Sequence, residues 1–281
     1  MAIRAVTFRG QACVELALPE GDRALVCLHG AQVLSWTPAG GPERLYLSPE
    51  AVFDGSTAIR GGVPVCFPQF NQRGPLPKHG FVRNRAWTPL PEASDAGLAV
   101  LALRDDDDTH RLWPHAFNAR VEIALAPGAL TVGFVVENTG AESFEFTLAL
   151  HSYLHTGDID GVRLHGLGGV PFWDSVDDTH PDPLSAGEAL AFTAETDRVY
   201  QAAAAPLTLS DSLGSLEIAQ DPVYGQTVVW NPGAALCATL ADMPDDGYRH
   251  MLCVEAAAID DPVRLAPGDT WSGAQRLSVT G

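Results

Sequence analysis

Two side chains that could exchange protons near neutral pH lie in segments that are otherwise mostly apolar. His151 lies in the segment 144–154, and Glu255 lies in the segment 251–257. An imidazole and a carboxylate can act as general acid and general base when their surroundings tune their pKa values. The pattern alone leaves other readings open, because His151 could be a hydrogen-bonded, partly exposed histidine and Glu255 a surface or ion-paired glutamate.

Both segments have the alternation that is typical of β-strands, in which side chains two residues apart point to the same face. In the first segment one face is apolar, and His151 lies in the middle of the other, mixed face. In the second segment Glu255 is the single acid of an apolar run, which predicts either a sheet surface or a pocket that holds a carboxylate. The fold must therefore bring two distant strands together if this pair is to work.

A second chemical feature is a stretch without acids in a strongly acidic chain. The 281 residues carry 35 acids and 17 bases, a formal net charge of −18. No acid occurs between Gly55 and Pro91, which we call the acid-free window. It holds five bases, for a formal charge of +5: Arg60, Arg73, Lys78, Arg83 and Arg85. Local positive charge on a negative protein favours a site for a small anion rather than a polyanion.

The rest of the chain predicts an all-β fold. Short strand-like runs alternate with Gly, Pro and Asp turn signals, as in β-sandwiches and barrels; the clearest runs are 131–137, 144–154, 227–230 and 251–256. Helical patterns are scarce, with one possible turn at 202–205. We expect the acidic run 105–108 to be a solvated loop, because it lacks the alternating ligands and turn glycine of a calcium loop. No linker-like change in composition divides the chain, so we expect one domain spanning residues 1–281.

Composition and charge exclude several classes of function. Nucleic acids and anionic membranes require an extended basic face, which argues against both as partners. The five cysteines are scattered and form no Cys-x-x-Cys pair, which indicates buried reduced thiols rather than a disulfide framework or a zinc site: Cys13, Cys27, Cys66, Cys237 and Cys253. The first residues lack the apolar core of a signal peptide, and no apolar run is long enough to span a bilayer. We expect a cytoplasmic protein, and a monomer rather than an oligomer.

Nine motifs follow one another along nearly the whole chain: GAQVLSW (30–36), LYLSPEAVFDGSTAIRGGVPVCFPQF (45–70), KHGFVRNRAW (78–87), WPHAF (113–117), LALHSYLHTGDI (148–159), ETDRVY (195–200), VVWNP (228–232), YRHMLCVEAAAI (248–259) and LAPGDTW (265–271). Each is weak alone, but the ordered set is specific. Together they resemble the aldose 1-epimerase superfamily, and more narrowly its glucose-6-phosphate 1-epimerase, or hexose-6-phosphate mutarotase, branch.

The resemblance implies an antiparallel β-supersandwich of the galactose mutarotase-like type, with the site on its concave face. It implies that His151, in the motif ALHSY, is the general acid and that Glu255, in CVEA, is the general base. It also implies a set of substrate contacts, with His79 as a neighbour that lines the same cluster: Arg60, Lys78, Arg83 and Asp197.

The resemblance divides the bases of the acid-free window. Guanidinium groups bind phosphate oxygens with directed, often paired hydrogen bonds, so we expect Arg60 and Arg83, together with Lys78, to clamp a phosphate. Arg73 and Arg85 are expected to be surface or structural residues. Asp197 is expected to accept a hydrogen bond from a sugar hydroxyl, although a structural ion pair with Arg198 is the alternative.

The chain departs from the family pattern at several positions. Gln69 and Asn71 stand where members often have tryptophan and glycine, and Lys78 stands where we expect a neutral polar residue such as glutamine. The tryptophan of an NPW motif is replaced by Gly233, and Ala256 follows the glutamate where proline is usual. The first two changes bear on sugar preference, because they fall in the expected binding loop.

The implied reaction is exchange of the α and β anomers at C1 of a hexose 6-phosphate such as D-glucose 6-phosphate. Glu255 takes the proton of the C1 hydroxyl while His151 protonates the ring oxygen, and the opened aldehyde rotates before closing again. The reaction needs no metal, nucleotide or redox cofactor. It needs an ionised Glu255 and a protonated His151, which their proximity would favour. The alternatives are a mutarotase for free aldoses, which has no use for the positive window, and a non-catalytic carbohydrate-binding module.

Overall fold

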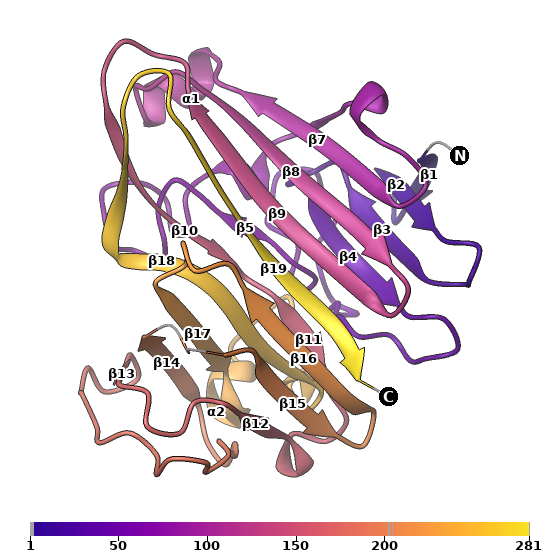
Figure 1. Ribbon diagram of the computed structural model, residues 1–281, viewed down its shortest axis with the longest axis vertical. Coiled ribbons are helices and arrows are strands. Elements are labelled where there is room, and N and C mark those ends of the chain that lie inside the picture. The colour runs from indigo at the N-terminus through magenta and orange to yellow at the C-terminus, as the bar shows by residue number, and fades with distance from the viewer. Residues whose placement is uncertain (1–2, 202, 204, 281) are drawn as a thin grey trace.

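The chain folds into three antiparallel sheets joined by turns and short helices (Figure 1). The computed structural model describes residues 3–201, 203 and 205–280. Two of the four residues of the helical turn expected at 202–205 therefore lie outside the described part. None of the helices in the described residues is long and apolar enough to cross a membrane.

The smallest sheet is formed by the N-terminal residues and lies at the right of Figure 1. Its strands are neighbours in sequence and pair in sequence order: β1 (Arg4–Phe8), β2 (Gln11–Ala17), β3 (Arg23–Cys27) and β4 (Gln32–Thr37). An isolated bridge between Val33 and Val63 connects β4 to the acid-free window.

The second sheet has seven strands and carries both candidate acid/base residues. Its order is β13 (Phe172–Asp174), β14 (Thr196–Gln201), β17 (Gln226–Asn231), β18 (Met251–Leu265), β10 (Phe144–Leu150) and β5 (Val65–Cys66), with β11 (Tyr153–His155) also paired to β18. The strand β18 is the centre of the sheet, because β17 lies on one side of it and both β10 and β11 lie on the other.

The third sheet has eight strands and runs diagonally across Figure 1. Its order is β12 (Arg163–His165), β15 (Leu207–Asp211), β16 (Gly214–Gln220), β19 (Thr270–Thr280), β9 (Ala129–Asn138), β8 (Phe117–Ala126), β7 (Leu98–Arg104) and β6 (Thr88–Pro89). Buried and partly exposed residues alternate along β8 and β9, as expected for a sheet with one face on the core.

One large cluster of buried apolar side chains includes residues from all three sheets. Phe67 lies at its centre, with ring centroids 5.0 Å from Phe134 of the eight-stranded sheet and 5.1 Å from Phe146 of the seven-stranded sheet. The all-β prediction is thus confirmed, and the core that the sheets share is what a single domain over residues 1–281 would require.

Helices are short, and one of them contradicts the sequence analysis. The α-helices are α1 (Asp107–Leu112) and α2 (Gly233–Cys237), and the 3₁₀ turns are η1 (Val82–Asn84), η2 (Pro91–Ala93), η3 (Ile159–Gly161) and η4 (Gly247–His250). The loop expected at 105–108 is wrong for Asp107 and Asp108, which begin α1 after its cap Asp106, although residues 106–108 are exposed to solvent as expected. The Asp106 carboxylate accepts from the Thr109 backbone N–H at 2.8 Å, and Thr109 Oγ1 accepts from the Asp106 N–H at 2.9 Å, which is a reciprocal capping box.

Candidate active site

His151 lies in a break between two strands rather than inside one. The single run expected at 144–154 is divided into β10 and β11, with His151 and Ser152 between them. The break is held by the acid-free window: the His151 N–H donates to the Pro64 carbonyl at 2.9 Å, and the Tyr153 N–H donates to the Gly62 carbonyl at 2.8 Å. The imidazole therefore has a fixed backbone even though it lies outside a regular strand.

Glu255 lies in β18 directly across from this break. Its neighbours in β18 pair with residues on the two sides of the break, Cys253 with Tyr153 and Ala256 with Leu150. The register thus places Glu255 beside His151, and Nδ1 of His151 lies 3.3 Å from Oε1 of Glu255. Both residues are buried, with 8% and 1% of their surface exposed. The sheet register therefore brings together the two residues that were expected to act as acid and base.

Burial favours the uncharged forms of both members of this pair. It raises the pKa of Glu255 well above its usual value, and the nearby carboxylate of Asp197 adds to the rise. It lowers the pKa of His151 well below its usual value, helped by His79, Arg83 and Arg60. Desolvation therefore outweighs the effect of proximity, which was expected to favour an ion pair. The neutral pair and the ion pair each hold one transferable proton. They differ only in whether Glu255 or His151 carries it.

A cavity of about 270 Å³ opens over the pair. All seven residues that were singled out as acid, base or substrate contacts line it: Arg60, Lys78, His79, Arg83, His151, Asp197 and Glu255. They come from the seven-stranded sheet and from the acid-free window. The sheet contributes the acids and the catalytic histidine candidate, whereas the window contributes the bases.

Arg60 is connected to the acid/base pair through Tyr153, and it is already paired with a carboxylate. Its Nε donates to Asp242 Oδ1 at 3.1 Å, and its Nη1 donates to the Tyr153 hydroxyl at 3.2 Å. The ring of Tyr153 in turn stacks on that of His151, with centroids 4.7 Å apart and planes 8° apart. A carboxylate from outside the window therefore reaches a base that was expected to be free for a phosphate.

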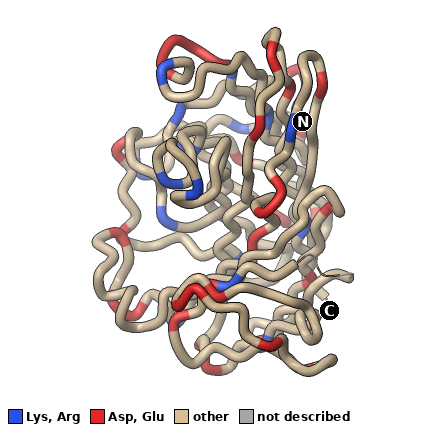
Figure 2. Tube along the Cα trace, turned by 90° about the vertical axis from the view of Figure 1, so that its left-hand side faces the viewer, with Lys and Arg blue, Asp and Glu red and all other residues tan. Residues whose placement is uncertain are grey.

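Lys78 and Arg83 lie on the loop side of the cavity. Lys78 is exposed, and Nη2 of Arg83 donates to its backbone carbonyl at 2.9 Å. Among the described residues the window's ion pairs involve its other three bases, so these two keep their charges for a ligand. In Figure 2 several Lys and Arg positions lie close together in coiled loops, whereas Asp and Glu positions are spread over the whole trace.

His79 lies between these bases and His151. Its Nδ1 accepts from the Asn71 N–H at 3.3 Å, which assigns the ring proton of the neutral form to Nε2. Burial lowers its pKa to about 3, and the charges of Arg83, Lys78 and Arg60 add to the effect. The ring therefore stays neutral near pH 7 and offers the cavity an N–H donor without a charge.

Asp197 belongs to the cavity and not to an ion pair with Arg198. Arg198 Nε donates instead to Asp174 Oδ2 at 2.9 Å. Asp197 accepts from the Ser175 hydroxyl at 3.2 Å, and burial raises its pKa. A partly buried carboxylate that accepts from one hydroxyl can accept further hydrogen bonds, such as the hydroxyls of a sugar would supply.

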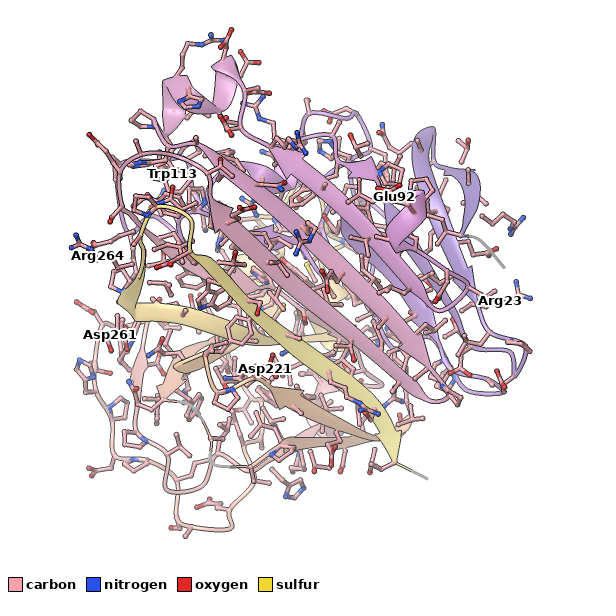
Figure 3. The ribbon with its side chains drawn as sticks, turned by 45° about the horizontal axis from the view of Figure 1, so that its top comes forward. Arg23, Glu92, Trp113, Asp221, Asp261 and Arg264 are labelled. Carbon is pink, nitrogen blue, oxygen red and sulfur yellow. The ribbon has the colours of Figure 1, made fainter. Side chains whose placement is uncertain are left out.

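Arg73 and Arg85 lie outside the cavity, as expected. Nη1 of Arg73 is 3.2 Å from Asp260 Oδ1, and its guanidinium lies over the ring of Trp173 at 4.5 Å from the centroid. Nη1 of Arg85 is 3.5 Å from Asp108 Oδ2. Asp260 begins the exposed half of β18, whose outer residues Asp261 and Arg264 are labelled at the edge of the molecule in Figure 3.

The glycines of the two basic motifs are required by close backbone contacts. Gly62 has φ +62°, and a Cβ there would lie 2.0 Å from the Val33 carbonyl oxygen. Gly80 has φ +69°, and its Cβ would lie 2.0 Å from the Phe67 carbonyl oxygen. Only glycine fits such positions without strain. The glycines thus let the chain turn sharply beside Arg60 and His79 and direct both side chains to one cavity.

Several cavity residues were not predicted from the sequence. They are mainly aromatic and apolar: Phe70, Tyr153, Val228, Trp230, Leu236 and Leu240. Tyr153 could have been found, because it shares a strand face with His151. Leu236 and Leu240 come from α2 and the loop after it, where the sequence gives no signal that they return to the site.

Gln69 and Asn71, which depart from the family pattern in the binding loop, lie in different positions relative to the cavity. Asn71 lines the cavity. Gln69 is buried and faces the loop itself, where its amide nitrogen donates to the carbonyls of Asn71 and Leu76 at 3.0 and 3.1 Å and its oxygen accepts from the Leu76 N–H at 2.9 Å. Gln69 therefore shapes the loop, and Asn71 alone of the two can contact a ligand directly.

One group of residues at the site has the chemistry of metal ligands. Atoms of His151, Cys253 and Glu255 lie within 4.8 Å of one another, and all three residues are buried. An imidazole, a thiol and a carboxylate are typical zinc ligands. Cys253 is fully buried and, unlike His151 and Glu255, is not among the described residues that line the cavity. The two members of this group that line the cavity are the two expected to act as acid and base.

Comparison with known proteins places these features in one family. A family model described as Aldose 1-epimerase matches residues 12–278. A relative from Escherichia coli (strain K12), named "Putative glucose-6-phosphate 1-epimerase", is 41% identical over 263 residues, which cover 92% of this chain and 87% of the relative. One of the same name from Cenchrus ciliaris is 36% identical over 267 residues, covering 91% of this chain and 81% of the relative.

The fold is also found in solved structures. The crystal structure of a "putative mutarotase" from Salmonella typhimurium superposes with a TM-score of 0.89 and 32% sequence identity, covering 99% of this chain and 94% of that one. This match confirms the predicted mutarotase-like β-sandwich.

Proposed function

The chain belongs to the aldose 1-epimerase family and is an isomerase, and we propose that it interconverts the α and β anomers of D-glucose 6-phosphate or a related hexose 6-phosphate. Glu255 and His151 carry the two proton transfers. Arg60, Lys78 and Arg83 bind the phosphate, and Asp197 and His79 bind the sugar. The observation that carries the proposal is a buried His/Glu pair 3.3 Å apart in the same cavity as three bases.

The proton count of the pair matches the reaction. Ring opening removes one proton from the C1 hydroxyl and adds one to the ring oxygen, so a pair that holds one proton suffices. Opening starts with Glu255 ionised and His151 protonated, and it ends with both neutral. Ring closure runs the same transfers in reverse, from the neutral form. The uncharged state that burial favours is therefore the state in which the open aldehyde is bound.

The substrate itself shifts the pair toward the form that opens the ring. Arg83 and Arg60 lower the pKa of His151. A phosphate carries about −1.5 to −2 charges at pH 7, and when it binds these guanidinium groups it offsets their charge. The pKa of His151 then rises, which favours the imidazolium that donates to the ring oxygen. A free sugar lacks this effect, so the phosphate contributes to catalysis as well as to binding.

Two positioned proton-transfer groups are enough for this reaction. Each contributes roughly 10²–10⁴-fold to the rate, and anomer exchange already proceeds slowly in water. The proton transfers require no metal or redox step. The proposal keeps the expected setting of a cytoplasmic monomer that acts on a small molecule, since the net charge of −18 disfavours polyanionic partners.

The test is anomer exchange measured by NMR with glucose 6-phosphate and with glucose as substrates. We expect exchange of glucose 6-phosphate well above the buffer rate and much slower exchange of glucose. Equal turnover of both sugars would indicate a mutarotase for free aldoses. Exchange at the buffer rate for both would indicate a non-catalytic binding module.

A further inference from the structure

The guanidinium group of Arg60 is held from two sides by the protein. Asp242 Oδ1 lies 3.1 Å from Nε and 3.0 Å from Nη2, and the Tyr153 hydroxyl accepts from Nη1 at 3.2 Å. A guanidinium has five N–H donors, so these contacts leave donors on both terminal nitrogens for a ligand. Arg60 lines the cavity, whereas Asp242 is not among the described residues that line it.

A single buried serine fixes the distance between the two chain segments that carry this ion pair. Arg60 and Asp242 are 182 residues apart in sequence. The Ser48 N–H donates to the Arg60 carbonyl at 3.0 Å, and the Ser48 hydroxyl donates to the Asp242 carbonyl at 2.7 Å. Ser48 is fully buried, so both backbone bonds are protected from water. The backbones are thus held together independently of the ion pair between the side chains.

We infer that Asp242, supported by Ser48, is a positioning residue that holds the Arg60 guanidinium in the orientation that binds the substrate phosphate. This inference rests on the proposed function and adds a residue that acts through Arg60 without touching the substrate. An unsupported arginine side chain samples many rotamers. Fixing its orientation before binding reduces what is lost when the ligand arrives.

Asp242 could instead weaken phosphate binding, and its removal would then change KM in the opposite direction. A carboxylate beside a phosphate-binding arginine could act as a competing anion, which the substrate has to displace. Removal of a competitor strengthens binding of the phosphorylated sugar, whereas removal of a positioning residue weakens it. The ion pair is only partly exposed, at 23% for the Arg60 side chain and 22% for the Asp242 side chain, so either effect would be measurable.

The distinguishing experiment is steady-state anomer exchange of glucose 6-phosphate by the Asp242→Ala variant. We expect KM to rise about tenfold while kcat stays within about twofold, because the acid/base pair keeps its own backbone anchors. Asp242→Asn keeps an oxygen acceptor for Nε and is expected to give a smaller rise. Asp245→Ala removes an exposed acid three residues along the same loop and is the matched control, with KM unchanged.

Ser48→Ala tests the same inference without removing a charge. It is expected to raise KM about threefold, again with little change in kcat. An unchanged or lower KM in Asp242→Ala contradicts the positioning role. If that variant does not fold, an unchanged or lower KM in both Asp242→Asn and Ser48→Ala contradicts it instead. Failure of the wild-type protein to exchange glucose 6-phosphate would contradict the proposed function itself, so the two failures are distinguishable.

Discussion

The floor and the rim of the cavity are built in different ways. On the floor, His151 and Glu255 are almost fully buried and their positions follow from the register of the central strands. On the rim, Lys78 is exposed and Arg83 is partly exposed, and both lie in loops or a short 3₁₀ turn. Under the proposed function the proton transfers take place in the buried sheet, and the phosphate is bound by loops whose charge can change without disturbing that sheet.

Arg60 belongs to neither region alone. It comes from the acid-free window, but its contact with Tyr153, which stacks on His151, connects it to the floor. A substitution on the floor should therefore mainly affect kcat, and a substitution on the rim should mainly affect KM. A substitution beside Arg60 tests how far the effects on kcat and KM are separate.

The largest effect is expected from the floor. Glu255→Gln keeps the size of the side chain but removes the group that accepts the C1 proton, so kcat should fall about 10³-fold, with KM for glucose 6-phosphate within about threefold. Exchange NMR at saturating substrate measures this directly. If the variant retained more than a tenth of the wild-type rate, Glu255 would not be the base.

The next effect is expected from the rim. Lys78→Ala and Arg83→Ala each remove a charged partner of the phosphate, which should raise KM for glucose 6-phosphate about 10-fold each, since a charge-assisted hydrogen bond contributes about 1.5–3 kcal/mol. Exchange of free glucose should not fall, because loss of Arg83 removes a positive charge that lowers the pKa of His151. Initial rates over a range of both sugars test this, and an equal loss for both sugars would assign the two bases to the sugar ring.

A smaller effect is expected on stability in acid. The pKa of His79 is about 3 in the folded protein and 6.5 in the unfolded chain, so below pH 6.5 the unfolded state takes up a proton that the folded state refuses. The free energy of unfolding should therefore fall as the pH is lowered from about 6.5 toward 3. His79→Asn removes this contribution, and asparagine tolerates the positive φ of 64° at this position.

Thermal denaturation of the wild type and of His79→Asn between pH 8 and pH 5 measures that difference. The melting temperature of the variant should decline less than that of the wild type over this range. His151 is also buried in its neutral form, so part of the decline in melting temperature will remain in the variant. Parallel curves would mean that His79 is protonated in the folded protein.

The smallest effects are expected from the two bases of the window that lie outside the cavity. Arg73→Ala and Arg85→Ala break ion pairs that are partly exposed, and such pairs contribute about 0–1 kcal/mol. KM and kcat for glucose 6-phosphate should stay within about twofold. A tenfold rise in KM for either variant would mean that the whole window, rather than the rim alone, binds phosphate.

The sequence predicted what depends on local pattern and on ordered motifs. Strands at 131–137 and 227–230 are found inside β9 and β17, and the seven residues singled out from the motifs all line one cavity. The acid-free window indicated an anion site, although it did not distinguish Lys78 from Arg73. The resemblance to the family separated the two, and the structure gives the physical reason, because Asp260 and Trp173 engage Arg73 from strands far along the chain.

What the sequence could not predict depends on contacts between distant segments. The position of Glu255 opposite His151 depends on a break between β10 and β11 and on the register of both with β18. The partner of Arg60 lies 182 residues away in a loop without any recognisable motif. The uncharged state favoured for the acid/base pair depends on burial, which overrides the attraction that proximity alone would suggest.

The most direct test of the division between floor and rim is the ratio of kcat/KM for glucose 6-phosphate to kcat/KM for glucose. It should be measured by exchange NMR for the wild type and for the Lys78→Ala/Arg83→Ala double variant. We expect the wild type to favour the phosphorylated sugar by at least about 10²-fold and the double variant to lose most of this preference while its turnover of glucose does not fall. A preference that survives in the double variant, or a loss of activity toward both sugars alike, would contradict the account.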